Sequence, residues 1–93
     1  MFPSPAALTI ATYRLTHRRI LDLAEKLIRR ATTTQPDNAR LWNDQGLILN
    51  LRGNDGEADR GFRYAIRLAR DFAEPYHHLA ALRAKQDRLD DAV

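Results

Sequence analysis

The chain has 93 residues, enough for one small domain and too few for a deep cleft between two lobes. Hydrophobic residues make up 44% and charged residues 29%, as in ordinary folded domains. The net charge of +3 permits an acidic partner without requiring one. The absence of cysteine excludes disulfides, thiolate nucleophiles and zinc–thiolate sites.

Apolar residues recur at helical spacing along the chain, and no segment alternates with the period of two that a strand requires. The pattern predicts helices over residues 5–18, 20–34, 39–52, 56–70 and 74–86, with a short stub over 88–93. Turn-forming residues at 32–38, 53–56 and 70–75 separate the later helices. Short connections between helices of similar length favour antiparallel neighbours, so the predicted fold is all-α.

An internal repeat appears when the chain is shifted against itself by 34 residues. Large and small apolar positions keep their character under this shift: Trp42 aligns with Tyr76 and Leu8, Gly46 with Ala80 and Thr12, Ala58 with Ala24 and Ala92, Phe62 with Ile28, and Ala65 with Ala31. Small residues let two antiparallel helices approach closely, and large ones fill the space between successive helix pairs.

These residues make the chain resemble the tetratricopeptide repeat family. The motif is best kept at Trp42, Gly46, Ala58, Phe62 and Ala65 of the middle unit. The resemblance implies one domain over 1–93 that folds as a right-handed helical-repeat solenoid of antiparallel helix pairs. The solenoid would contain about two and a half units, over residues 5–38, 39–72 and an incomplete 73–93. It also implies a scaffold or protein–protein interaction module rather than a catalyst.

The inventory of reactive residues points the same way. The single serine, Ser4, lies near the terminus, and no phosphate-binding loop pattern occurs. Asp90 and Asp91 are neighbours that point about 100° apart on a helix, so they form no carboxylate pair. His77 and His78 are adjacent, whereas a metal site on a helix needs a spacing of four. We therefore expect no enzymatic activity, cofactor or metal.

In the family, the first helix of each unit lines a concave groove. Carried over by position, the resemblance implies a partner groove formed by Thr9, Tyr13, Arg40, Asn43, Asp44, Leu47, Asn50, Glu74, His77, His78, Ala81 and Lys85. Asp44 and Glu74 stand where chaperone-tail binders have an asparagine and a lysine, and they would repel a terminal carboxylate. The expected partner is instead a peptide or helix with its own hydrogen-bonding groups.

The third unit stops about five residues into its second helix, which predicts an uncapped end with Leu79, Leu82 and Leu89 partly open. Such an end implies either a fragment of a longer array or a surface that pairs with another copy or another protein. We favour the fragment, because the cut falls inside a helix.

The alternative function is nucleic-acid or phosphate binding through an arginine stripe on the outer, convex helix, at Arg60, Arg63, Arg67 and Arg70. A second basic region contains Arg14, Arg18, Arg19, Arg29 and Arg30. A favourable Asp59–Arg63 pair and the lack of interleaved aromatics favour a solvated face, so nucleic acid is not the expected partner. The uncharged stretch 1–13 is too short for a membrane span and lacks the basic start of a signal peptide, which favours the cytoplasm.

Overall fold

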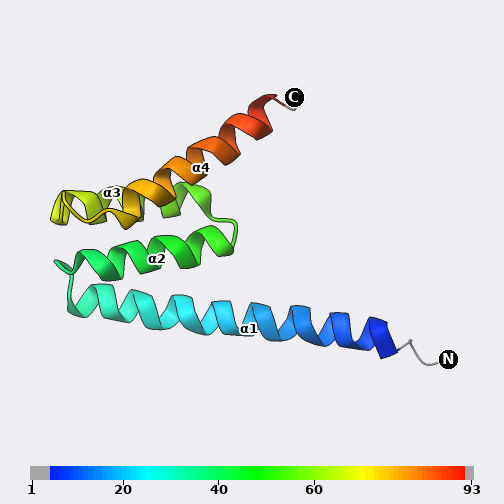
Figure 1. Cartoon of the computed structure of the whole chain (residues 1–93). Helices are drawn as coiled ribbons and strands as arrows, with labels where there is room; N and C mark the ends of the chain where they lie inside the picture. The colour runs from blue at the N-terminus through cyan, green and yellow to red at the C-terminus, as the bar shows by residue number, and fades with distance from the viewer. Residues whose placement is uncertain (1–4, 92–93) are drawn as a thin grey trace.

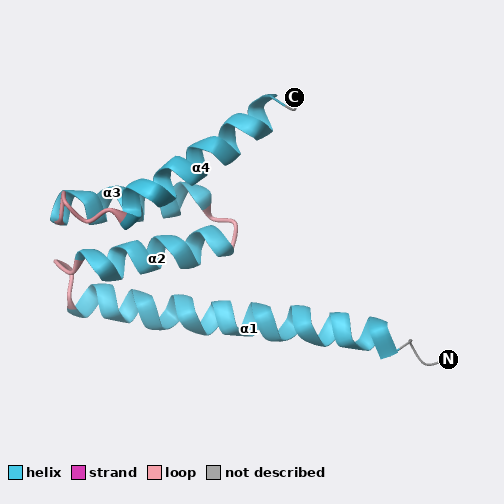
Figure 2. Cartoon of the chain, in the orientation of Figure 1, coloured by secondary structure: helices cyan, strands magenta, loops and turns pink. Residues whose placement is uncertain are grey.

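The computed structural model describes residues 5–91, with the side chains of Thr9 and of residues 12–91. This range contains four helices and no strand: α1 Pro5–Thr34, α2 Ala39–Leu51, α3 Asp55–Leu68 and α4 Glu74–Asp91 (Figures 1 and 2). The all-α prediction is confirmed. In chain order the helices lie one against the next, and α4 also touches α2.

The first helix corrects the prediction of two helices over 5–18 and 20–34, because α1 continues through residue 19. The later turn between α2 and α3 depends on Gly53, whose φ is 84°, followed by Asn54 as the N-cap of α3. The residues 34 positions earlier are Arg19 and Ile20. A left-handed residue with a side chain costs about 1–2 kcal/mol, and Arg19 stands in the place of that glycine. The helix therefore continues, and the first unit forms no hairpin.

The last helix gives a similar correction. The sequence predicted a helix over 74–86 and a separate stub over 88–93, but α4 runs unbroken from Glu74 to Asp91. The last two residues of the predicted stub lie outside the described range. Asp87 stands 34 residues after Gly53, so the glycine that would permit a turn is again missing.

The core lies where α2 and α3 cross. Leu49, Ala58, Phe62 and Leu82 form its buried cluster, and Phe62 is fully enclosed. A Cβ atom added to Gly46 would lie 2.6 Å from Cε1 of the Phe62 ring. The absence of a side chain at residue 46 is therefore what allows the ring to sit against the backbone of α2.

The connections before α2 and α4 repeat one hydrogen bond at the 34-residue interval. Trp42 Nε1 donates to the carbonyl of Pro36 at 2.8 Å, and Tyr76 Oη donates to the carbonyl of Arg70 at 3.0 Å. In both connections an aromatic side chain in the first turn of a helix fixes the loop that precedes it. The Asn38 side chain also caps α2 by accepting from the Leu41 amide.

The molecule is elongated, with a Cα radius of gyration of 16.5 Å against about 12 Å for a compact chain of this length. The cause is visible in Figure 1, where α2 lies along the C-terminal half of α1 and the N-terminal half projects past it. With 30 residues in α1 and 13 in α2, the projecting part is about 25 Å long at 1.5 Å per residue.

Candidate functional site

An apolar groove of about 580 Å³ runs between the C-terminal half of α1 and α2. Its walls are Ala24, Leu27, Ile28 and Ala31 from α1, and Asp44, Leu47, Ile48 and Leu51 from α2. Leu27 is 55% exposed and Leu51 is 64% exposed, which is high for leucines that share one surface. Clustered exposed apolar side chains of this kind mark an interaction site more often than isolated ones do.

The α1 wall of the groove has a covered counterpart elsewhere in the molecule. Moving its residues forward by 34 positions gives Ala58, Gly61, Phe62 and Ala65, which are the four buried residues of α3. On α3 this face is covered by α2, through Gly46 and Leu49, and by Leu82 of α4. On α1 the helix that would correspond to α2 is absent because no hairpin forms. In the 34-residue register, the groove on α1 therefore corresponds to the surface of α3 that α2 covers.

Among the described residues that line this groove, Asp44 is the one that is ionisable. Burial raises the pKa of its carboxyl above the ordinary value, the positive charges of Arg40 and His78 oppose that rise, and the charge of Glu74 adds to it. The groove therefore combines an apolar floor with one acidic group that a basic side chain of a partner would stabilise.

The predicted partner residues on α2 and α4 divide into two groups. Arg40, Asn43, Asp44, Glu74 and His78 are brought together, because Glu74 at the start of α4 reaches across to α2. Asn43 Nδ2 donates to Glu74 Oε2 at 3.1 Å, and Arg40 Nη2 lies 3.9 Å from Glu74 Oε1. Asn43 is fully buried, so it joins the two helices instead of facing a partner as predicted. The His78 ring stacks on Phe62, with the ring centroids 5.2 Å apart.

The other predicted groove residues lie apart from this cluster. Thr9 and Tyr13 are exposed on the projecting half of α1, and Asn50 is half-buried on α2. On α4, His77 and Ala81 are exposed, whereas Lys85 Nζ bonds Asp55 Oδ2 at 3.0 Å. Of the whole predicted set, only Asp44 and Leu47 line the apolar groove.

The predicted open end is closed only in part. Leu82 is only 8% exposed and belongs to the core cluster, and Leu79 is half-buried against that cluster. Leu89 is 55% exposed, as predicted for this end. The expectation of an open patch around Leu82 is therefore wrong, because α3 supplies the apolar surface that α4 needs.

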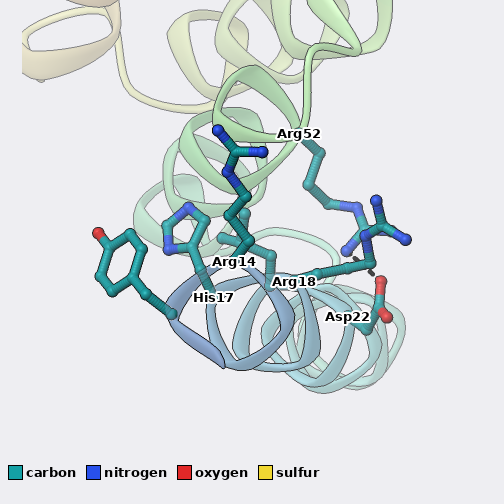
Figure 3. Close-up of a pocket in the computed structure, with 7 residues that line it drawn as sticks. Arg14, His17, Arg18, Asp22 and Arg52 are labelled. Carbon is teal, nitrogen blue, oxygen red and sulfur yellow. Dashed lines mark ion pairs between the residues drawn. The ribbon is translucent and has the colours of Figure 1, made fainter. Parts of the chain in front are cut away.

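Part of the second basic region forms a separate pocket of about 410 Å³ beyond the end of α2 (Figure 3). Arg14 and Arg18 of α1 and Arg52 after α2 contribute its positive side chains, and the His17 ring also lines it. Arg52 is paired with Asp22, which offsets part of this charge.

On α3, Arg63 Nε bonds Asp59 Oδ2 at 3.0 Å, the pair predicted for the arginine stripe.

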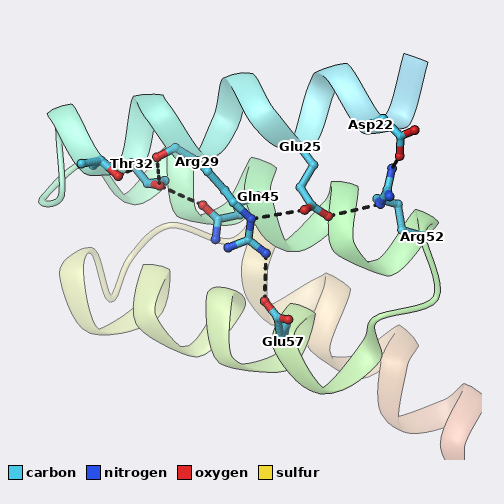
Figure 4. Close-up of polar contacts among 8 residues, drawn as sticks. Asp22, Glu25, Arg29, Thr32, Gln45, Arg52 and Glu57 are labelled. Atoms are coloured by element: carbon cyan, nitrogen blue, oxygen red, sulfur yellow. Dashed lines mark hydrogen bonds and ion pairs between the residues drawn. The ribbon is translucent and has the colours of Figure 1, made fainter. Parts of the chain in front are cut away.

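A polar network holds α1 against the remaining helices (Figure 4). Arg52 bonds both Asp22 and Glu25 of α1, while Arg29 bonds Glu25 and, at 3.0 Å, Glu57 of α3. The Glu57 carboxylate, with that of Glu25, raises the pKa of the Arg29 guanidinium. At the other end of this seam, Thr32 Oγ1 donates to Gln45 Oε1 at 2.8 Å, and both residues are buried.

The sequence analysis did not place Leu27 and Leu51 in a groove, because it predicted a separate helix over residues 5–18. The missing signal was available in the 34-residue register, which aligns Arg19 with the turn glycine Gly53.

Within residues 5–91, no three histidine or acidic side chains gather in a way that could hold a metal ion. No helix in this range is long and apolar enough to cross a membrane.

Comparison with known proteins gives no match: no family model, no curated protein and no solved structure is significantly similar to the chain.

Proposed function

We propose that this chain is a non-catalytic protein-interaction module built from tetratricopeptide-like helix pairs, and that it binds a helix of its partner in the groove between α1 and α2. The observation that carries the proposal is the correspondence between Ala24, Leu27, Ile28 and Ala31 and the buried face of α3. A face that is covered by a helix in one unit is open in the unit before it.

The groove also indicates what kind of helix it accepts. An amphipathic helix that lies in an apolar groove presents side chains at i, i+3 or i+4, and i+7. Leu27, Leu47 and Leu51 offer apolar contacts along the two walls, and Asp44 offers one site for a basic side chain. The expected ligand is an amphipathic helix with a small or apolar stripe and a basic residue beside it.

The test is a titration of the ¹⁵N-labelled chain with a synthetic amphipathic helical peptide that carries leucines at this spacing. We expect shifted amide signals from residues 24–31 and 44–51, and at least a tenfold loss of affinity in Leu27→Glu. Leu89→Glu is the matched control, because both leucines are 55% exposed and Leu89 lies outside the groove. Equal affinity of the two variants would exclude this groove as the binding site.

The alternative of nucleic-acid binding rests on the arginine stripe of α3. Arg63 is paired with Asp59, whose Oδ1 also lies 3.9 Å from Arg83 Nη2, so this acidic side chain offsets part of the positive charge of the stripe. The same titration with a short DNA duplex separates the two functions. Shifts confined to residues 60–70, with affinity that falls steeply as salt is raised, would favour the alternative.

A further inference from the structure

We propose that the natural occupant of the groove is the projecting segment, residues 5–18, of a second copy of this chain, so that two copies exchange their N-terminal helical halves. This inference rests on the proposed function, namely that the groove accepts a helix. It adds the identity of that helix and the symmetry of the assembly.

The register of the repeat identifies the segment that fits. Gly46 and Gly61 lie where α2 and α3 approach closely, since a Cβ atom at Gly61 would lie 3.5 Å from the Cα of Gly46. The residues 34 positions earlier are Thr12 and Leu27. Leu27 lines the groove and Thr12 is exposed on the projecting half of α1. Residues 5–18 therefore match the empty place in sequence register.

A second pair gives the same register. Leu49 and Ala58 belong to one buried cluster, and their counterparts are Leu15, which is exposed, and Ala24, which lines the groove. When residues 5–18 of one copy lie antiparallel to the second half of α1 of the other copy with Thr12 opposite Leu27, Leu15 lies opposite Ala24. Both contacts would bury apolar side chains that a single copy leaves open.

A chain cannot make these contacts with itself while α1 remains one helix. The helix continues through Arg19 and Ile20, so its first half points away from its own groove (Figure 1). Each copy therefore carries an open groove and a helical segment, exposed at residues 12–18, that matches the groove in the 34-residue register.

Two copies can fill both grooves at once by exchanging their N-terminal helical segments. The Thr12–Leu27 and Leu15–Ala24 pairs are centred on the same point, between residues 19 and 20. A twofold axis at this point places each N-terminal half in the groove of the other copy, in the register that an intact hairpin would have used. This arrangement is closed, so it predicts a dimer and not a filament.

The first test uses disulfide cross-linking in the full chain, which has no cysteine of its own. We expect Thr12→Cys/Leu27→Cys to oxidise to a covalent dimer of twice the 10.7 kDa chain mass, reversibly on reduction. The control, Thr12→Cys/Lys26→Cys, displaces the second cysteine by about 100° around α1 and should cross-link at least tenfold less. A disulfide within one chain would show that the hairpin closes on itself, and that result or cross-linking no stronger than the control overturns the proposal.

The second test restores the missing turn with Arg19→Gly/Ile20→Asn, the residues found at Gly53 and Asn54. Light scattering should show the unsubstituted chain as a dimer and this variant as a monomer at the same concentration, with circular dichroism confirming that it is folded. If the unsubstituted chain is a monomer at every concentration, exchange is excluded, yet binding of the model peptide would leave the proposed function standing. A variant that stays folded and dimeric also overturns the exchange.

Discussion

The crossing of α2 and α3 makes the stability of the chain depend on the absence of a side chain at Gly46. In Gly46→Ala, the new Cβ would lie 2.6, 2.7 and 2.9 Å from three atoms of the Phe62 ring. Real Cβ contacts of this length do not persist, so either the ring or α2 must move. The ring has little freedom, because Phe62 is fully buried among Leu49, Ala58 and Leu82.

The expected size of the effect follows from two opposing contributions. Inserting a methyl group into a well-packed core costs about 1–3 kcal/mol, and three contacts on an enclosed ring place this site near 3 kcal/mol. Replacing glycine by alanine inside a helix returns about 1 kcal/mol through backbone entropy and helix propensity. We therefore expect Gly46→Ala to lower the free energy of unfolding by about 2 kcal/mol.

The assay is urea unfolding followed by circular dichroism at 222 nm, at one fixed protein concentration, with linear extrapolation to water. Gly56→Ala is the matched control, since Gly56 is an exposed glycine of α3 with no atom within 4 Å of an added Cβ. It should leave stability unchanged or raise it by up to about 1 kcal/mol. A Gly46→Ala chain as stable as Gly56→Ala would refute the close crossing and the repeat packing inferred from it.

Two further substitutions test the contacts around the groove. Thr32→Val leaves the buried Gln45 Oε1 without the hydroxyl that donates to it at 2.8 Å, so it should lower the free energy of unfolding by about 1–3 kcal/mol in the same urea assay. The control is Thr33→Val at the exposed neighbouring position, which should lower it by well under about 1 kcal/mol. Asp44→Asn should stabilise the fold at pH 7. Burial raises the pKa of Asp44 in the folded state, so ionisation of this carboxyl lowers the stability of the chain as the pH rises through and above the ordinary pKa of an aspartate. The stability gained by Asp44→Asn should therefore vanish near pH 3, where the carboxyl is protonated, and thermal melts at both pH values check this. A gain of the same size at pH 3 would contradict the assigned cause.

The sequence predicted the central helices well because their ends carry explicit signals. The predicted ranges 39–52 and 56–70 differ by one or two residues at their ends from α2 and α3. Asn38 caps the start of α2, and Gly53 lies in the turn that separates α2 from α3. The range 5–34 lacked such signals. Apolar periodicity alone cannot distinguish one long helix from two short ones, and the repeat pattern wrongly supplied a turn at residue 19.

The candidate site was predictable only in part. The family resemblance implied that Asp44, Leu47 and Asn43 face a groove; Asp44 and Leu47 line the groove between α1 and α2, whereas Asn43 is buried. That burial depends on Glu74, which lies 31 residues further along the chain and supplies the acceptor for the amide. Leu82 was misplaced for a comparable reason, since it is buried in a cluster with Leu49 of α2 and with Ala58 and Phe62 of α3, which lie 20 or more residues earlier in the chain.

The central claim is that α1 passes through residue 19 as one helix and leaves the groove open to another helix. Backbone ¹³Cα chemical shifts of the full chain test it most directly. We predict uninterrupted helical shifts from Tyr13 to Ala24, like those within α3 and unlike those at Gly53 and Asn54. Non-helical shifts at Arg18, Arg19 and Ile20 would show a hairpin that fills the groove with its own residues, and they would contradict the account.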